Sequence, residues 1–285
     1  MLERLADKER QEVSGQVIFP NAVNYCVAKF GESKKICYFC NPNMEKAKVA
    51  YLLKHGYNEF RPKVALFDMD GVLYDSMPNH AKAWRESMAS YGLDMSEEDA
   101  YAFEGMRGFE TIKIVAGKQW GREISDDESA DMYRVKSDCY SACPVAMMMT
   151  GTYALQQEMR RSGLDIGVVT GSGQHSLLER VKSDYQGLVN ENIFVTALNI
   201  KKGKPAPDPY LKGMQLAGTM PWETVVVENA PLGVRAGVAA GAFTVAVNTG
   251  PLPDEMLLKE GADLLFHSMD EFRSELHRIL SPYTK

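Results

Sequence analysis

The sequence predicts an α/β fold in which a doubly wound parallel sheet carries an inserted helical domain. From about residue 150 onward, short apolar runs alternate with amphipathic helical patterns. Such alternation is typical of one parallel sheet with helices on both faces. The apolar run Val64–Phe67 starts the same pattern, and the stretch 78–146 after it has helical periodicity without a convincing strand.

Three regions follow from this pattern. We expect a core, a helical cap inserted into it, and an N-terminal extension of unknown role. The core comprises residues 61–77 and 147–285, the cap residues 78–146, and the extension residues 1–60. The extension holds one helical pattern, Asn43–His55, which Gly56 ends.

Capping residues and glycines indicate where the other helices begin and end. In the cap, one helix is expected at His80–Tyr91. A second is expected at Ser96–Phe103, where Ser96 and Asp99 form a capping box. Further helices are expected at Thr152–Arg161, Gln174–Lys182, Pro209–Leu216, Leu232–Ala239 and Met269–Leu280. Further strands are expected at Ile166–Thr170, Phe194–Thr196, Thr224–Glu228, Phe243–Val247 and Ala262–Phe266.

The bulk composition excludes several classes of protein. The chain has 285 residues and a net charge of −6, so no global attraction to nucleic acid or to an anionic membrane is expected. No apolar run is long enough to span a bilayer, and the N-terminus does not resemble a signal peptide. We therefore expect a cytoplasmic protein of undetermined oligomeric state.

The cysteines do not suggest a disulfide framework, because their number is odd in a chain of this size. The five are Cys26, Cys37, Cys40, Cys139 and Cys143. A zinc site could be drawn from the first three and His55, but a second clean Cys pair is lacking. Free thiols are the expected state.

Two aspartates end the first apolar run of the core. Asp68 and Asp70 follow Val64–Phe67 directly, and Gly71 comes next as a turn residue. Open α/β sheets place their active sites at the carboxyl ends of strands, and strand alternation points both side chains to the same side. Because two close carboxylates repel each other, we expect a divalent cation or a shared proton between them.

A phosphate cradle is predicted after the strand Ile166–Thr170. The hydroxyl of Thr170 is followed by Gly171, Ser172 and Gly173, and glycine-rich backbone that opens a helix can bind phosphate. Taken alone, this segment is also compatible with an ordinary strand–turn–helix joint.

Two more pieces fit the same site. Prolines stiffen the loop around Lys204, whose ammonium could screen the aspartates and bind phosphate oxygens. Glu228 and Asn229 lie at another strand end and offer oxygen ligands for a hard cation. The alternatives are a solvated basic loop and a helix cap.

Four motifs, in this order and spacing, resemble those of the haloacid dehalogenase superfamily. They are Asp68-Met-Asp70-Gly-Val, Val169-Thr-Gly-Ser172, Lys204-Pro and Val227-Glu-Asn229. The resemblance covers residues 62–280 and implies a Rossmann-like core with a C1-type cap. The stretch Phe67–Asp75, with His80 and Trp84 after it, resembles the β-phosphoglucomutase-like subfamily. Other segments resemble inorganic pyrophosphatases of that subfamily: Glu104-Gly, Val169–Gln174, Leu177–Arg180, Glu228–Val234 and Val247–Leu252.

The resemblance implies a role for each residue of the site. Asp68 would be the nucleophile that forms an aspartyl phosphate, and Asp70 the acid and base. Mg²⁺ would bind the Asp68 carboxylate, the Asp70 backbone carbonyl and Asn229. The transferring phosphoryl group would be held by Asp70, Thr170, Gly171, Ser172, Gly173 and Lys204.

Departures from the subfamily pattern affect the expected substrate. Many relatives have aspartate where this chain has Asn229, which favours a more anionic ligand or weakens metal binding without substrate. Glu104 stands where sugar-phosphate mutases have a lysine, and the resemblance implies that it reaches the metal when the cap closes. Arg107 lies one place before the expected arginine position. Together with Glu228 and His80, Arg107 is expected to support the site.

These observations favour a Mg²⁺-dependent hydrolase of inorganic pyrophosphate. The first alternative is a hexose-phosphate mutase or sugar phosphatase of the same subfamily. A non-catalytic binding protein on this fold is the remote alternative, because a fold does not fix function.

Overall fold

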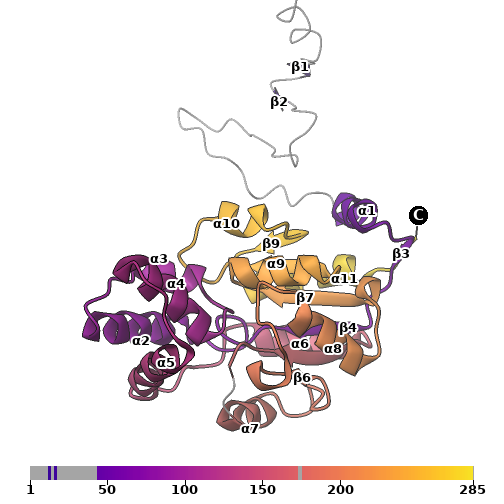
Figure 1. Ribbon diagram of the computed structural model, residues 1–285. Helices are drawn as coiled ribbons and strands as arrows, with labels where there is room; N and C mark the ends of the chain where they lie inside the picture. Colours follow the sequence, from indigo (N-terminus) through magenta and orange to yellow (C-terminus); the bar gives the residue numbers. More distant parts are fainter. Residues whose placement is uncertain (1–11, 14–15, 18–43, 173–174, 285) are drawn as a thin grey trace, which may run out of the picture. The chain divides into compact units, whose positions relative to one another are not determined.

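The chain forms a parallel sheet with helices on both faces and a separate bundle of helices beside one end of its strands (Figure 1). The structure is a computed structural model and describes residues 12–13, 16–17, 44–172 and 175–284. The chain divides into two units, Met1–Val49 and Ala50–Lys285. All the features that follow lie in the second unit unless stated otherwise.

Within the described residues, the sheet has six strands, all parallel. Their spatial order is β6 (Phe194–Val195), β5 (Asp165–Val169), β4 (Val64–Phe67), β7 (Thr224–Glu228), β8 (Phe243–Val247) and β9 (Leu264–Phe266). The strands are buried on both faces, which explains their continuous apolar sequences. The predicted doubly wound parallel sheet is therefore confirmed.

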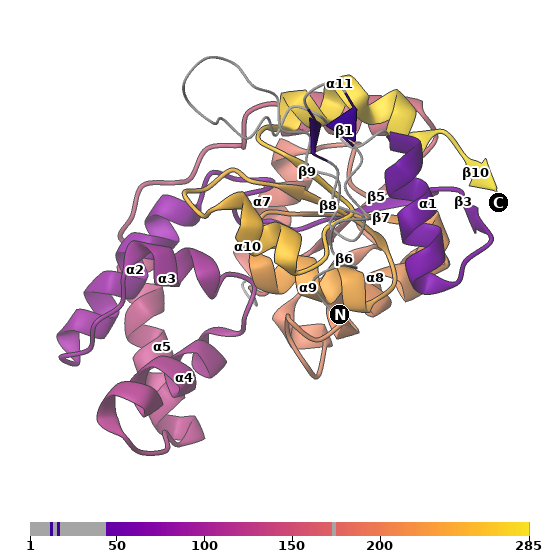
Figure 2. The ribbon, with the colours of Figure 1, turned by 90° about the horizontal axis from the view of Figure 1, so that it is seen from above.

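Helices cover the sheet in two layers. They are α6 (Thr152–Arg161), α7 (His175–Asp184), α8 (Asp208–Ala217), α9 (Pro231–Ala239), α10 (Asp254–Lys259) and α11 (Met269–Leu280), with short 3₁₀ turns at Ala197–Asn199 and Pro221–Glu223. Figure 2 shows α8 and α9 on one face and α11 on the other. Helix α6 packs against α11, and an apolar core joins α8 and α9 to β4, β5 and β7.

Four helices between β4 and α6 form a bundle with its own apolar core. They are α2 (Met77–Ser90), α3 (Glu97–Ala102), α4 (Gly108–Trp120) and α5 (Asp126–Ser141). The name cap is kept for this bundle. The chain enters and leaves it through two adjacent linkers, joined where the N–H of Asp75 donates to Met147 and that of Met149 donates to Leu73.

Other elements lie outside the sheet and the cap. Helix α1 (Met44–His55) crosses the boundary of the two units, and β3 (Glu59–Phe60) pairs with β10 (Tyr283–Thr284). In the first unit, β1 (Glu12–Val13) pairs with β2 (Gln16–Val17). In the part of the chain that the structure describes, no helix is long and apolar enough to cross a membrane.

Most predicted elements coincide with the structure to within three residues. Helix α2 begins at Met77 rather than His80, because Pro78 is accommodated in its first turn. Strand β9 begins at Leu264 rather than Ala262. Cys139 and Cys143 are free, whereas Cys26, Cys37 and Cys40 lie outside the described residues.

Candidate active site

The candidate site is built around Asp68, which directly follows β4 and is almost fully buried. Its Oδ1 accepts a hydrogen bond from Lys204 Nζ. Its Oδ2 is buried and has no hydrogen-bond partner in the described part of the chain. Burial raises the pKa of Asp68 well above its usual range, against the opposing effect of Lys204. A bound cation would favour the carboxylate form again.

Lys204 is held by a second carboxylate, Glu228, at the end of β7. Its Nζ lies 2.6 Å from Glu228 Oε1, which also accepts a 2.6 Å hydrogen bond from the hydroxyl of Tyr210. Glu228 Oε2 accepts from the backbone N–H of Asn229 at 3.0 Å. Burial lowers the pKa of Lys204, but Asp68 and Glu228 outweigh it, so that the net shift is upward. The ammonium therefore stays charged, and Glu228 serves as its anchor.

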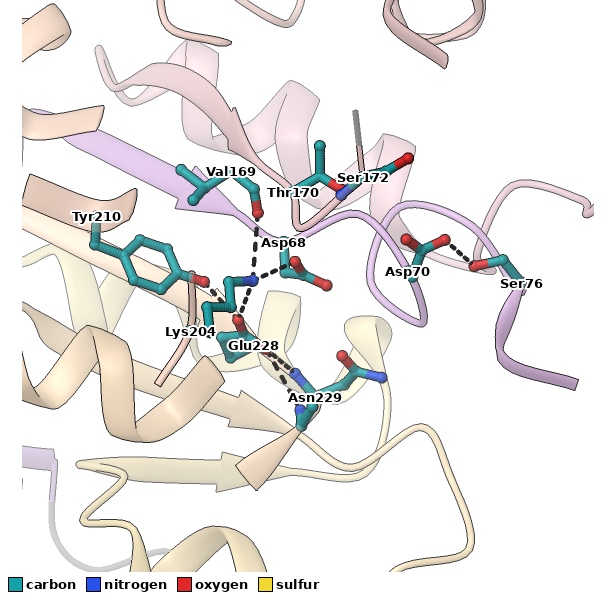
Figure 3. Close-up of polar contacts among 11 residues, drawn as sticks. Asp68, Asp70, Ser76, Val169, Thr170, Ser172, Lys204, Tyr210, Glu228 and Asn229 are labelled. Atoms are coloured by element: carbon teal, nitrogen blue, oxygen red, sulfur yellow. Dashed lines mark hydrogen bonds and ion pairs between the residues drawn. The ribbon is translucent and has the colours of Figure 1, made fainter. Parts of the chain in front are cut away.

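Asn229 offers the second unpaired oxygen of the site. Its Oδ1 is buried without a partner among the described residues. The loop of residues 68–76, between β4 and α2, is named the catalytic loop. A Cβ added to Gly71 would lie 2.0 Å from Asn229 Nδ2, so this loop can approach the amide only through a glycine. In Figure 3 the free oxygen of Asp68 and the side chain of Asn229 face the same part of the site. Buried polar atoms are normally paired, so two orphaned oxygens fit a cation with oxygen ligands.

Asp70 belongs to a separate hydrogen-bonded chain (Figure 3). Its Oδ1 accepts from Ser76 Oγ at 2.6 Å and lies 3.2 Å from His80 Nε2. Burial would raise the pKa of Asp70, but His80 and Ser76 outweigh it and lower the pKa to about 2. Asp70 is therefore a base at neutral pH, positioned to exchange a proton with a reacting group.

Lys136 of α5 extends this chain, and the sequence offered no motif that would single it out. Its Nζ lies 2.8 Å from His80 Nδ1 and 5.1 Å from the ring centres of Trp84 and Tyr140. Burial lowers the pKa of Lys136 to about 8, although Glu104 and Asp70 oppose the shift.

A cavity of about 50 Å³ lies between the cap and the carboxyl ends of the strands. Its acidic and basic lining residues are Asp70, His80, Glu104 and Lys136. Burial raises the pKa of Glu104, while His80 lowers it. The structure thus brings Glu104 to the same cavity as Asp70.

The cap loop after Glu104 lies directly on the core. A Cβ on Gly105 would lie 2.8 Å from Lys204 Cδ, and one on Gly171 would lie 3.1 Å from the Gly105 carbonyl oxygen. Arg107 turns elsewhere: it pairs with Glu110, its guanidinium lies 4.6 Å from the ring centre of Phe109, and it is not among the residues that line the cavity.

The predicted phosphate cradle lies at the end of β5. The backbone N–H of Ser172 donates to Thr170 Oγ1 at 3.0 Å, and Gly171 and Ser172 line the cavity. Gly173 lies outside the described residues. Over the described residues, no group of three or more His, Cys, Asp or Glu side chains could hold a metal, so a cation here would also need amide or backbone oxygens.

The comparison with known families agrees with this arrangement. A family model described as haloacid dehalogenase-like hydrolase matches residues 65–247, which contain the strand-end residues and the cap. The chain belongs to the haloacid dehalogenase-like hydrolase family. The superfamily predicted from the four motifs is thereby confirmed.

Individual relatives extend the likeness to most of the chain. Hexitol phosphatase A from Escherichia coli (strain K12) is 34% identical over 74% of this chain and 93% of its own length. Validoxylamine A 7'-phosphate phosphatase from Streptomyces hygroscopicus subsp. limoneus is 28% identical over 74% and 96%.

A solved structure from Bacteroides vulgatus, provisionally named as a β-phosphoglucomutase, is 45% identical. Its TM-score is 0.81, and the match covers 85% of this chain and 98% of that one. The β-phosphoglucomutase-like resemblance is therefore confirmed. None of these three relatives is named as an inorganic pyrophosphatase.

Proposed function

We propose that this protein is a Mg²⁺-dependent phosphatase that releases phosphate from a small sugar or polyol phosphate. The observation that carries the proposal is the state of Asp68. This buried carboxylate has one oxygen held by Lys204 and the other free, and it lies beside the hydrogen-bonded pair of Asp70 and His80.

In the proposed reaction, the carboxylate of Asp68 attacks phosphorus, and the bond between phosphorus and the ester oxygen breaks. The pair of Asp70 and His80 supplies the proton to the leaving oxygen. Asp70 then takes a proton from a water molecule, which attacks the aspartyl phosphate and restores the Asp68 carboxylate. Lys204 and Thr170, with the N–H groups near Gly171, would stabilise the charge on the phosphoryl group.

Mg²⁺ would be held by Asp68, Asn229 and the backbone carbonyl of Asp70, with Glu104 as a further ligand. The orphaned oxygens of Asp68 and Asn229 support this assignment. Bound there, the ion would neutralise charge on the phosphoryl oxygens. We expect chelation by EDTA to remove phosphatase activity and added Mg²⁺ to restore it.

The names of the two curated relatives favour a phosphate ester of a sugar-like compound as substrate. The charges favour hydrolysis over a mutase reaction, because a mutase must bind a second phosphoryl group. Lys136 is the one lysine or arginine among the described residues that line the cavity, and Arg107 is paired with Glu110 instead. A site of this kind suits a monophosphate.

Pyrophosphate is the second candidate substrate, and the observation that favours it is Glu104. A carboxylate in the cavity would repel a phosphoryl oxygen unless a cation lay between them. Pyrophosphate brings enough negative charge to bind such a cation, and it is smaller than a hexose phosphate.

The test is a phosphate-release assay with Mg²⁺ on hexose phosphates, hexitol phosphates and pyrophosphate. We expect the highest kcat/KM on a sugar or polyol phosphate, and Asp68→Asn should abolish turnover. The matched control, Asp94→Asn, changes an exposed aspartate of the cap and should retain activity. A preference for pyrophosphate that Glu104→Gln removes selectively would favour the second candidate. Full activity of Asp68→Asn would exclude the covalent mechanism.

A further inference from the structure

The segment Asn248–Leu252, directly after β8, contacts the catalytic loop. The hydroxyl of Thr249 donates to the backbone carbonyl of Gly71 at 2.6 Å. Gly71 follows Asp70 and packs against the amide of Asn229. Its own N–H donates to the Tyr74 carbonyl at 2.7 Å. Thr249 therefore fixes the position of Gly71, the residue of the catalytic loop that packs against Asn229.

The next residue of the segment contacts the cap. A Cβ on Gly250 would lie 2.9 Å from two ring carbons of Tyr101, so the present contact requires a glycine. Tyr101 belongs to α3 and is 8% exposed. Its carbonyl accepts a hydrogen bond from the N–H of Glu104 at 3.3 Å. Tyr101 thus lies in the turn that carries Glu104 to the cavity.

The segment is anchored to the core at one end and to the cap at the other. The N–H of Asn248 donates to the Phe266 carbonyl at 2.7 Å, and its side-chain amide donates to Leu252 and Asp254 at 2.8 and 2.6 Å. Leu252 belongs to the apolar cluster of the cap, in which Trp84 is also buried. The segment, which continues from β8, is therefore joined to the catalytic loop by a hydrogen bond and to α3 by a packing contact.

From these contacts we infer that Asn248–Leu252 is a positioning segment, which fixes the position of the catalytic loop relative to the cap. Thr249 fixes Gly71 through its hydrogen bond, and Gly250 fixes Tyr101 through its packing contact. The inference rests on the proposed function, because the two loops so positioned carry Asp70 and Glu104. It assigns a task to a stretch of sequence that takes no part in the phosphoryl transfer itself.

The first test compares Thr249→Val with Thr249→Ser, since only serine keeps the hydroxyl. Thr249→Val should lower kcat about tenfold, less than the roughly hundredfold that a ~1 Å misplacement of a reacting group can cost, with little change in KM. Thr249→Ser should retain the wild-type kcat. Equal loss in both variants, or no loss in either, would overturn the role of Thr249.

The second test compares Gly250→Ala in the wild type and in a Tyr101→Leu background. The added methyl group should raise KM severalfold in the wild type, and much less where the tyrosine ring has been removed. Hydrogen–deuterium exchange of residues 97–107 provides a readout without turnover, and exchange should be faster in Gly250→Ala than in wild type. If no phosphate ester or pyrophosphate is hydrolysed, the proposed function fails while this readout still applies. Unchanged exchange in Gly250→Ala would overturn the inference.

Discussion

At the scale of single residues, the site separates two groups of charges. Asp68, Lys204 and Glu228 form a buried ion-paired cluster. Asp70, His80 and Lys136 form a second chain on the cap side. In the proposed reaction, the first group would hold and stabilise the phosphoryl group, and the second would move protons. Separate roles for the two aspartates thus have a structural basis in their different partners.

Lys136 gives this arrangement a pH dependence. Burial lowers its pKa to about 8, so the ammonium loses its proton as the pH rises through that value. We expect kcat/KM to decline above pH 8 because the charge beside His80 is lost. Lys136→Arg keeps the charge and should move the decline to higher pH, whereas Lys136→Met should lower activity about tenfold or more below pH 8 and remove the alkaline decline. A pH profile between 6 and 10 measures this, and the same alkaline decline in Lys136→Arg would contradict it.

The site residues that were predicted from local pattern share one property, which is their place next to a strand end or in a proline-rich loop. Glu104, Arg107 and His80 were predicted from the family resemblance alone. Asp68, Thr170 and Asn229 could be identified because parallel strands bring their carboxyl ends together. Lys136 and Tyr210 could not, since each is a polar residue of an amphipathic helix. Only the tertiary packing turns these two side chains toward the site.

At the scale of elements, apolar runs and glycine stops predicted the sheet and most helices. Helix α10 was missed because its six residues follow Pro251 and Pro253, which are typical of a loop. The pair of β3 and β10 was missed since each strand has two residues and pairs with a distant part of the chain. Short elements of this kind depend on tertiary contacts rather than on local pattern.

Asp263, where the chain enters β9, has a testable effect on stability. Its Oδ2 accepts from the N–H of Thr244 at 2.8 Å, and burial raises its pKa from the ordinary 3.8 to about 6. Between these values the folded state binds more protons than the unfolded state, so stability falls as pH rises from 4 to 6. This rise in pKa corresponds to a loss of about 3 kcal/mol at most in the free energy of unfolding.

Asp263→Asn removes this titration and keeps an oxygen that can accept from Thr244. We therefore expect a higher free energy of unfolding at pH 7 than in wild type, and little difference at pH 4. Urea denaturation at both pH values measures the change, with Asp131→Asn at an exposed site of α5 as the control. A variant less stable than wild type at pH 7 would show that the ion pair with Lys54 dominates.

At the scale of the whole molecule, the family and the chemistry are better determined than the substrate. The strand-end residues that are proposed to react lie on the core, within the stretch that the family model matches. Most residues that line the cavity lie on the cap, where a single residue such as Glu104 changes the charge of the cavity. This division explains why the motifs predicted the family correctly, while the sequence favoured pyrophosphate and the names of the curated relatives favour sugar-like phosphates.

The last prediction concerns residues 1–43, which precede α1. Each residue assigned to the site lies within the unit Ala50–Lys285. Near the start of this unit, the side chain of Tyr51 anchors α1. Its ring packs against Phe60 and Phe243, and its hydroxyl donates to the Gly241 carbonyl at 2.9 Å. A chain that starts at Met44 retains all of α1 and these contacts. It should therefore keep the kcat, KM and unfolding midpoint of the full chain, measured by phosphate release and thermal denaturation. Loss of activity with an unchanged midpoint would instead assign residues 1–43 a part in catalysis.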